Sequence, residues 1–350
     1  MIDAYRPVFL AIGAALLGAA LFSLLGVPAG ALVGSTLAVT AVAALRWHPR
    51  VPGTLRNLGF TTIGVTLGAG VTPHFVTDVL RFPISLFALT VTILIVMVSS
   101  SFVLRRFFGA AKTTSILATS PGALSYSLSL ATDRPGAEVD IPFVMVLQSL
   151  RLLLITLLLP PIVAIVDQAS GQESMATLAP HTLNLPVSIV LIALSAGLGY
   201  VAQKIRIPAA YLLAGVVLSG LGHGVGLLEG RPSTFLTFFG FSLAGAVIGA
   251  RFSSITRDQL RALFFAGCAA TGLAVGLSGA VSALVAHLLD LPFGQVWVSF
   301  APGGVEGMSA MALSLGYDPA YVATHHIFRL LLLIAVLPLF VRPPKATAGG

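Results

Sequence analysis

The sequence predicts an all-α polytopic membrane protein built from two homologous repeats, and three observations lead to this prediction. Hydrophobic residues make up 57% of the 350 residues and charged residues only 9%, whereas soluble domains carry about 25% charged residues. The mean hydropathy is +0.99, and apolar stretches near the length of a membrane span recur along the whole chain. Finally, the second half of the chain repeats the pattern of the first.

The internal match is clearest at glycine, proline and charged positions. At an offset of 181 residues, Gly59-Phe60 aligns with Gly240-Phe241, and Pro121-Gly122 aligns with Pro302-Gly303. At an offset of 178, a polar set in one half meets a polar set in the other: Asp140, Gln148, Arg151 and Asp318, His326, Arg329. Repeats of this kind are typical of secondary transporters. We therefore expect a first membrane repeat at 1–168, a polar linker at 169–182 and a second membrane repeat at 183–350.

Six apolar elements are expected in each repeat. The first of them resembles a signal peptide, but Val27-Pro28-Ala29 at its end aligns with Ile207-Pro208-Ala209, so it is retained as a mature span. In the first repeat the elements are predicted at 8–25, 27–45, 55–75, 82–104, 111–131 and 140–166. In the second repeat they are predicted at 183–203, 207–222, 233–252, 259–289, 292–313 and 319–341.

The basic residues predict that the repeats are inverted relative to each other. In the first repeat they follow the second and fourth elements, at Arg46, Arg50, Arg56, Arg105, Arg106 and Lys112. In the second they follow the first, third and last elements, at Lys204, Arg206, Arg251, Arg257, Arg261, Arg342 and Lys345. Cytoplasmic loops are enriched in Lys and Arg, so both chain termini are expected in the cytoplasm.

Inversion requires an odd number of crossings in each repeat, so one of the six elements must enter and leave on the same side. The fifth is the best candidate, because Pro121-Gly122 and Pro302-Gly303 interrupt it. Each repeat would then have about five crossings plus a broken, re-entrant fifth element. Twelve crossings in parallel are the alternative, which leaves the reversed charge pattern unexplained.

The two breaks form the predicted site for a substrate or ion. Half-helix ends near the bilayer midplane expose unpaired N–H groups, which transporters use to hold anionic groups; a packing kink is the alternative. Glu306 is expected at membrane depth, where a carboxylate binds a cation, carries a proton or pairs with an arginine. The alternative is that Glu306 lies near a membrane end and is solvated. The predicted residues are Ser120, Pro121, Gly122, Ser125, Pro302, Gly303, Gly304, Glu306 and Ser309.

Each sixth element carries a polar triad on one helix face. Asp and Arg are eleven residues apart in both repeats, which is close to three helical turns. Arg151 and Arg329 stand inside apolar runs, near mid-membrane. We expect the triads to line the site, the arginines anchoring an anion or balancing Glu306, with structural pairing as the alternative: Asp140, Gln148, Arg151, Asp318, His326 and Arg329.

Signals for other chemistry are weak. Adjacent His325 and His326 point about 100° apart on a helix, which does not suit one metal ion, so no metal, cofactor or catalytic residue is expected. Gly64-x-x-x-Gly68 and Gly245-x-x-x-Gly249 predict closely packed helices. Basic residues are scattered, so nucleic acid is not an expected partner. The expected partners are the lipid bilayer and an unknown small-molecule substrate, and homo-oligomerisation stays open.

The motifs of the second repeat resemble those of a known family. Pro302-Gly-Gly-Val-Glu-Gly-Met308, followed by Asp318 and by His326-x-x-Arg329-Leu-Leu, is similar to the AbrB family of bacterial integral membrane proteins, and the resemblance spans nearly the whole chain. It implies a duplicated membrane domain in the bacterial inner (plasma) membrane, in a family whose members are called regulators or ammonia monooxygenases. The first repeat departs from the motif, with Ser125 in place of Glu306.

The leading hypothesis is a secondary permease for a small metabolite, with indirect regulatory effects. An anionic substrate fits the two arginines, and a proton or sodium gradient would drive it. The alternative is a membrane sensor or regulator of gene expression that transports nothing. A membrane monooxygenase is a third, disfavoured reading, because the sequence offers no convincing copper or iron site. We therefore expect no enzymatic activity.

Overall fold

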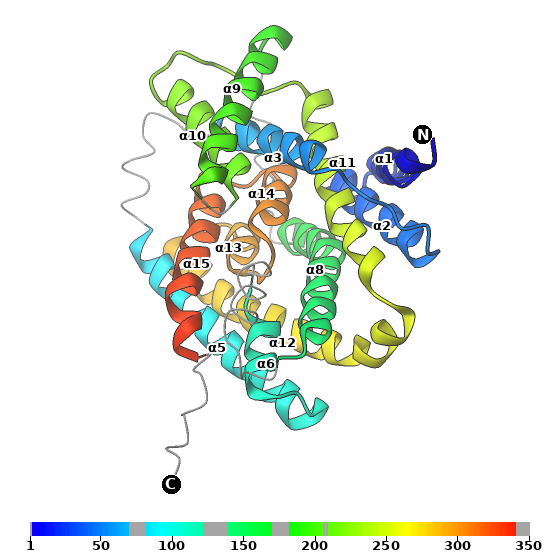
Figure 1. Cartoon of the computed structure of the whole chain (residues 1–350). Helices are drawn as coiled ribbons and strands as arrows, with labels where there is room; N and C mark the ends of the chain where they lie inside the picture. The colour runs from blue at the N-terminus through cyan, green and yellow to red at the C-terminus, as the bar shows by residue number, and fades with distance from the viewer. Residues whose placement is uncertain are drawn as a thin grey trace.

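The computed structural model describes residues 2–69, 82–121, 139–169, 182–205, 207 and 209–340, and within these ranges the regular elements are all helices (Figure 1). Seven of the described helices are long and apolar enough to cross a membrane, judged by length and composition. The predicted class, an all-α polytopic membrane protein, is confirmed.

The described helices follow the predicted elements closely. From the first predicted repeat come α1 (Ile2–Leu24), α2 (Gly30–Ala44), α3 (Gly53–Gly68), α5 (Pro83–Phe108), α6 (Lys112–Thr119) and α8 (Ile141–Ala169). From the second come α9 (Leu185–Lys204), α10 (Ala210–Gly224), α11 (Thr234–Ala250), the short 3-10 helix η2 (Arg251–Ser254), α12 (Arg257–Leu289), α13 (Phe293–Phe300), α14 (Val305–Ser314) and α15 (Pro319–Phe340).

The helices gather into two groups (Figure 1). In the first helix group, defined as α1, α2, α3, α9, α10 and α11, α2 packs against α1 and α11, and α10 packs against α9 and α3. In the second helix group, defined as α5, α6, α8 and α12 to α15, α12 packs against α5, α8 and α13. The groups meet where α3 and α11 contact α14, and where α2 and α11 contact α8.

Glycines allow the first helix group to pack at backbone distance. A Cβ added at Gly68 of α3 would lie 2.6 Å from the carbonyl oxygen of Val216 in α10. One added at Gly249 of α11 would lie 2.8 Å from the carbonyl oxygen of Thr36 in α2. Gly64 and Gly245, one turn earlier, face the same partners just as closely. The predicted close packing of both glycine pairs is confirmed.

The helices α2 and α10 begin in the same unusual way. Ala29 and Ala209 precede them with φ of 55° and 51°, in the left-handed region. A residue with a Cβ pays about 1 kcal/mol or more for this conformation. Each alanine follows a proline in the sequence, and each helix is 15 residues long. The two predicted repeats therefore share a left-handed turn at equivalent alanines, a conformation that alanine does not favour.

Among the hydrogen bonds that join the two predicted repeats, two sets connect helix ends. The carbonyl of Ala44, the last residue of α2, accepts from Arg257 Nη2 at 2.9 Å, and the carbonyl of Pro49 in the following loop accepts from Ser253 Oγ at 2.9 Å. Elsewhere, the Tyr317 hydroxyl before α15 donates to the carboxylate of Asp167 near the end of α8. Burial, together with the Asp167 carboxylate, raises the pKa of Tyr317. The end of α2 thus lies beside the start of α12, and the end of α8 beside the start of α15.

Candidate substrate site at the helix breaks

A four-residue break separates α13 from α14 at the position that the sequence predicts. Ala301 has φ −59° and ψ 139°, because the ring of Pro302 disfavours the α conformation at the preceding residue. The Gly303 N–H then bonds the Ala301 carbonyl at 2.8 Å, and helical bonding resumes where the Met308 N–H donates to Gly304 at 2.9 Å. Ala301, Pro302 and Gly303 are buried, so irregular backbone lies inside the protein, where it needs internal partners.

Arg329 of α15 supplies partners to this break. Its Nη1 donates to the carbonyl of Ala301 and its Nη2 to that of Gly303, both at 2.6 Å. The side chain is only 1% exposed. The last carbonyls of a helix have no partner within the helix and carry a partial negative charge. The planar guanidinium bonds the Ala301 carbonyl at the end of α13 and the Gly303 carbonyl inside the break, so it stabilises the end of α13 and fixes the path of the break.

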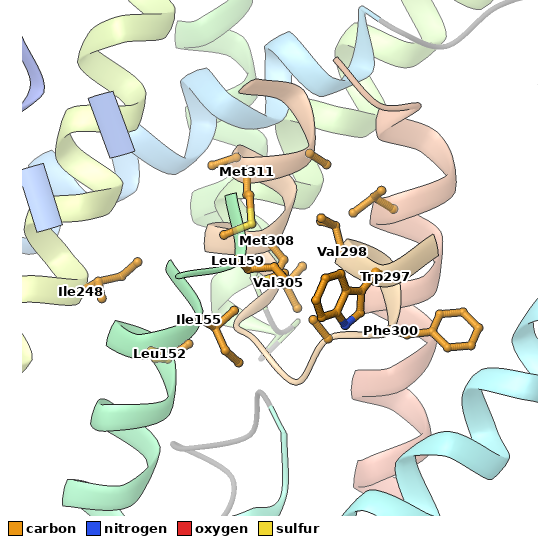
Figure 2. Close-up of a cluster of buried hydrophobic side chains, with 14 of the residues drawn as sticks. Leu152, Ile155, Leu159, Ile248, Trp297, Val298, Phe300, Val305, Met308 and Met311 are labelled. Atoms are coloured by element: carbon orange, nitrogen blue, oxygen red, sulfur yellow. The ribbon is translucent and has the colours of Figure 1, made fainter. Parts of the chain in front are cut away.

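Apolar side chains surround the break. Figure 2 shows the loop between α13 and α14 among Trp297, Phe300, Val305 and Met308, with Ile155 of α8 beside them. All five belong to the main buried cluster of the protein. In such low-polarity surroundings, charges and dipoles interact strongly because water does not screen them.

The first break is held by Arg151 of α8 in the same manner. Its Nη1 donates to the carbonyls of Ala118 at 3.4 Å and Thr119 at 3.2 Å, and its Nη2 to that of Ser120 at 3.1 Å. Arg151 is 5% exposed, and Ser120 has left the helical conformation just before Pro121. At the offset of 181 residues, Ser120 and Ala301 are equivalent, and each accepts from the arginine of its own sixth element.

The aspartates of the two triads begin their helices. Asp140 Oδ1 accepts from the Phe143 N–H at 2.9 Å, and Asp318 Oδ1 accepts from the Tyr321 N–H at 3.3 Å. The backbone N–H of Asp140 also donates to Thr114 Oγ1 at 3.1 Å, while that of Asp318 donates to Gln295 Oε1 at 3.0 Å. Such capping satisfies N–H groups at the helix start, and it leaves both aspartates about three turns from the breaks.

The middle residues of the triads lie beside the half-helices. Gln148 Nε2 donates to the Leu117 carbonyl of α6 at 2.8 Å. His326 is fully buried, and its ring lies near the Val298 carbonyl of α13, although neither ring nitrogen has a hydrogen-bond partner among the described residues. Leu117 and Val298 are again equivalent at the offset of 181 residues. The structure therefore brings Gln148, Arg151, His326 and Arg329 to the half-helices beside the breaks.

Ser309 adds an unpartnered polar atom near the second break. It lies on α14 and is fully buried, and its hydroxyl has no hydrogen-bond partner among the described residues. Burying an unpaired hydroxyl costs about 1–3 kcal/mol, so a ligand or water that bonded this group would recover free energy. Glu306 also lies on α14, but its side chain is outside the described part of the structure, as are Gly122 and Ser125.

Two further residues, which the sequence analysis did not place in the site, lie near the second break. His325 is buried, and its Nε2 is 2.8 Å from Ser85 Oγ of α5 while its Nδ1 is 2.7 Å from the Tyr321 carbonyl. Arg251 lines a small cavity of about 30 Å³ with Gly303 and Gly304. The signal for Arg251 was its basic charge, which we had assigned to membrane orientation alone.

The site carries concentrated positive charge. Arg151 and Arg329 place one guanidinium group at each break, and Arg251 lines the small cavity beside Gly303 and Gly304. Among the described residues, no group of three or more His, Cys, Asp or Glu side chains could hold a metal ion. The chemistry that this arrangement can perform is recognition of negative charge by guanidinium groups and backbone N–H groups.

Fold and site together define a helical polytopic membrane protein with a buried, arginine-bound helix break. The chain belongs to the AbrB family: the family described as "Transition state regulatory protein AbrB" matches residues 32–343. The chain is also 26% identical, over an alignment of 366 positions, to "Uncharacterized protein YhjN" of Bacillus subtilis (strain 168). That alignment covers 95% of this chain and 91% of the Bacillus protein.

Proposed function

We propose that the protein is a secondary transporter of a small metabolite with two inverted repeats, and that its substrate passes the broken helices. The observation that carries the proposal is the break between α13 and α14, held by buried Arg329 and adjoining a small cavity at the boundary between the two helix groups. Discontinuous helices near the midplane are the recurrent binding element of such transporters.

Hydrogen bonds between the predicted repeats support inversion. In an inverted arrangement, the end of α2 and the start of α12 lie on the same side of the membrane, which the bond from Arg257 to Ala44 requires. The end of α8 and the start of α15 also lie together, as the bond from Tyr317 to Asp167 requires. Twelve parallel crossings would place each pair on opposite sides. We accordingly propose ten crossings, re-entrant fifth elements, cytoplasmic termini and an inner-membrane location.

The proposed driving force is a proton or sodium gradient. Protein reconstituted in liposomes should take up radiolabelled succinate, citrate or phosphate when a pH or sodium gradient is imposed. Glu306→Gln and Ser309→Ala should lower that flux at least severalfold, because both lie on α14 beside the break. Arg261→Gln, on the exposed surface of α12, serves as the control. Undiminished flux in both α14 variants would refute the assignment of the site.

The description of the family as a regulatory protein favours a second candidate. As a membrane sensor, the protein would bind its ligand at the same breaks and pass the signal to a partner. This candidate predicts saturable ligand binding with no gradient-driven flux, and a change in transcript levels in cells that carry Glu306→Gln. Both candidates are non-enzymatic.

A further inference from the structure

A second, larger cavity lies between the two predicted repeats, where the end of α2 meets η2. Its volume is about 750 Å³, within the range of roughly 300–1,000 Å³ that is typical of small-molecule sites. One wall comes from the first repeat, through residues 48–51 and the start of α3; the other comes from the second, through the ends of α9 and α11, the start of α10, and η2. Neither repeat alone encloses it.

The lining of this cavity is basic and polar. Four groups that carry or can gain positive charge line it: His48, Arg50, Arg56 and Arg251. Neutral hydrogen-bonding side chains complete the polar wall: Asn57, Gln203, Ser253 and Ser254. None of the described lining residues has a carboxylate. Loops that serve only to orient the protein in the membrane need basic residues near the bilayer. They do not need those residues to converge on one concave surface.

The basic cavity adjoins the break between α13 and α14. Phe60, Val247 and Arg251 line both the basic cavity and the small cavity of about 30 Å³ that touches Gly303 and Gly304. These three side chains therefore form a neck, with the basic cavity on one side and the break on the other. Arg251 is half-buried there.

We propose that the basic cavity binds a small molecule carrying two or more carboxylate or phosphate groups, and that Arg251 is the specificity-determining residue between this cavity and the break. Several cationic groups around one space favour a multiply charged anion over a singly charged or neutral molecule, since each can make a charge-assisted hydrogen bond. The inference rests on the proposed function, because it treats the cavity as the entrance to the transport site. Anion binding to the cavity can nevertheless be measured without measuring transport.

Binding is tested with the full-length protein in nanodiscs of neutral phosphatidylcholine, at constant ionic strength. Citrate, succinate and inorganic phosphate are titrated while thermal unfolding and equilibrium dialysis are followed, with ammonium and glucose as non-anionic probes. At least one of the three anions should bind and raise the unfolding temperature. Arg251→Gln and Arg56→Gln should each weaken that binding about tenfold or more, while Arg261→Gln leaves it unchanged.

Two results would overturn the inference. One is binding of these anions with equal affinity in Arg251→Gln, Arg56→Gln and the unaltered protein. The other is stabilisation by phosphatidylglycerol in the nanodisc and by none of the soluble anions, which would identify a lipid headgroup as the ligand. Flux measurements separate this inference from the transport proposal. Arg251-dependent anion binding without flux supports the cavity and contradicts transport, whereas flux together with equal anion binding in the Arg251→Gln and Arg56→Gln variants supports transport and contradicts the cavity.

Discussion

Arg151 and Arg329 each donate to carbonyl groups that the helix breaks leave without helical partners. Taking a guanidinium out of water is expensive, and the cost is recovered only where its N–H groups are satisfied. Arg329 has two donors at 2.6 Å from the carbonyls of Ala301 and Gly303, so its geometry is favourable. The Nε of Arg151, by contrast, has no hydrogen-bond partner among the described residues.

Arg329→Ala should destabilise the protein by about 3 kcal/mol, because two buried carbonyls lose charge-assisted partners. Arg329→Lys should fall between this variant and the unaltered protein, since a single ammonium group cannot reproduce the planar fork. Reversible unfolding in detergent with denaturant measures both, with Arg261→Ala on the exposed surface of α12 as the control. Equal stability of all four proteins would show that Arg329 does not hold the break.

Gly245→Ala should destabilise the protein by about 1–3 kcal/mol, because the added Cβ collides with Ser35 and the backbone of α2. Gly272→Ala on α12 is the matched control, since nothing lies within 4 Å of its added Cβ. The control should be neutral or up to about 1 kcal/mol more stable, through helix propensity. The difference in unfolding free energy between the two variants is the measured quantity. A difference near zero would contradict the close contact between α11 and α2.

At the scale of elements, hydropathy and two prolines predict most of the chain. Apolar length locates the spanning helices to within a few residues at most ends, and Pro302 explains why the fifth element of the second repeat divides into α13 and α14. With 8 and 10 residues, these helices are about 12 Å and 15 Å long, and neither spans a hydrocarbon core of about 30 Å. This shortness is compatible with the re-entrant path that we propose for them.

A re-entrant fifth element places both of its ends on one side of the membrane. In a Cys268→Ser background, Lys112→Cys and Glu138→Cys should therefore both react with a membrane-impermeant maleimide from the cytoplasmic side only. Labelling in right-side-out and inside-out vesicles gives the orientation, and Arg6→Cys tests the proposed cytoplasmic N-terminus in the same vesicles. If Lys112→Cys and Glu138→Cys react from opposite sides, the element crosses fully and the proposal of ten crossings is wrong.

At the scale of the whole molecule, each predicted repeat contributes its first three elements to the first helix group and its last three to the second. The small cavity lies where the groups meet, between α3 and α11 of one and α8 and α14 of the other. An interface between packed bodies is where relative motion requires the least disruption of either body. This arrangement suits a substrate site that opens alternately to the two sides.

Inverted repeats place equivalent loops on opposite sides of the membrane. Trp47, after α2, and Glu229, after α10, occupy equivalent loops and are both exposed. In the Cys268→Ser background, Trp47→Cys should react with the impermeant maleimide from the cytoplasmic side and Glu229→Cys from the external side. Reaction of both from the same side would establish parallel repeats and contradict the inverted topology that we propose.

The sequence by itself determined that the protein lies in a lipid bilayer, where its helical spans are and the two places where a helix must break. These features depend on local composition and on proline geometry. It also indicated the buried arginines, since a charge inside an apolar run has few alternatives. Only the tertiary structure decided what these residues contact. Gln148, Arg151 and Arg329 bond carbonyls about 30 residues away in the chain. Arg251 lies about 50 residues before the second break, and only the fold brings it to the small cavity beside Gly303 and Gly304. Spacing along one helix cannot specify a partner on another, because packing between helices sets that distance.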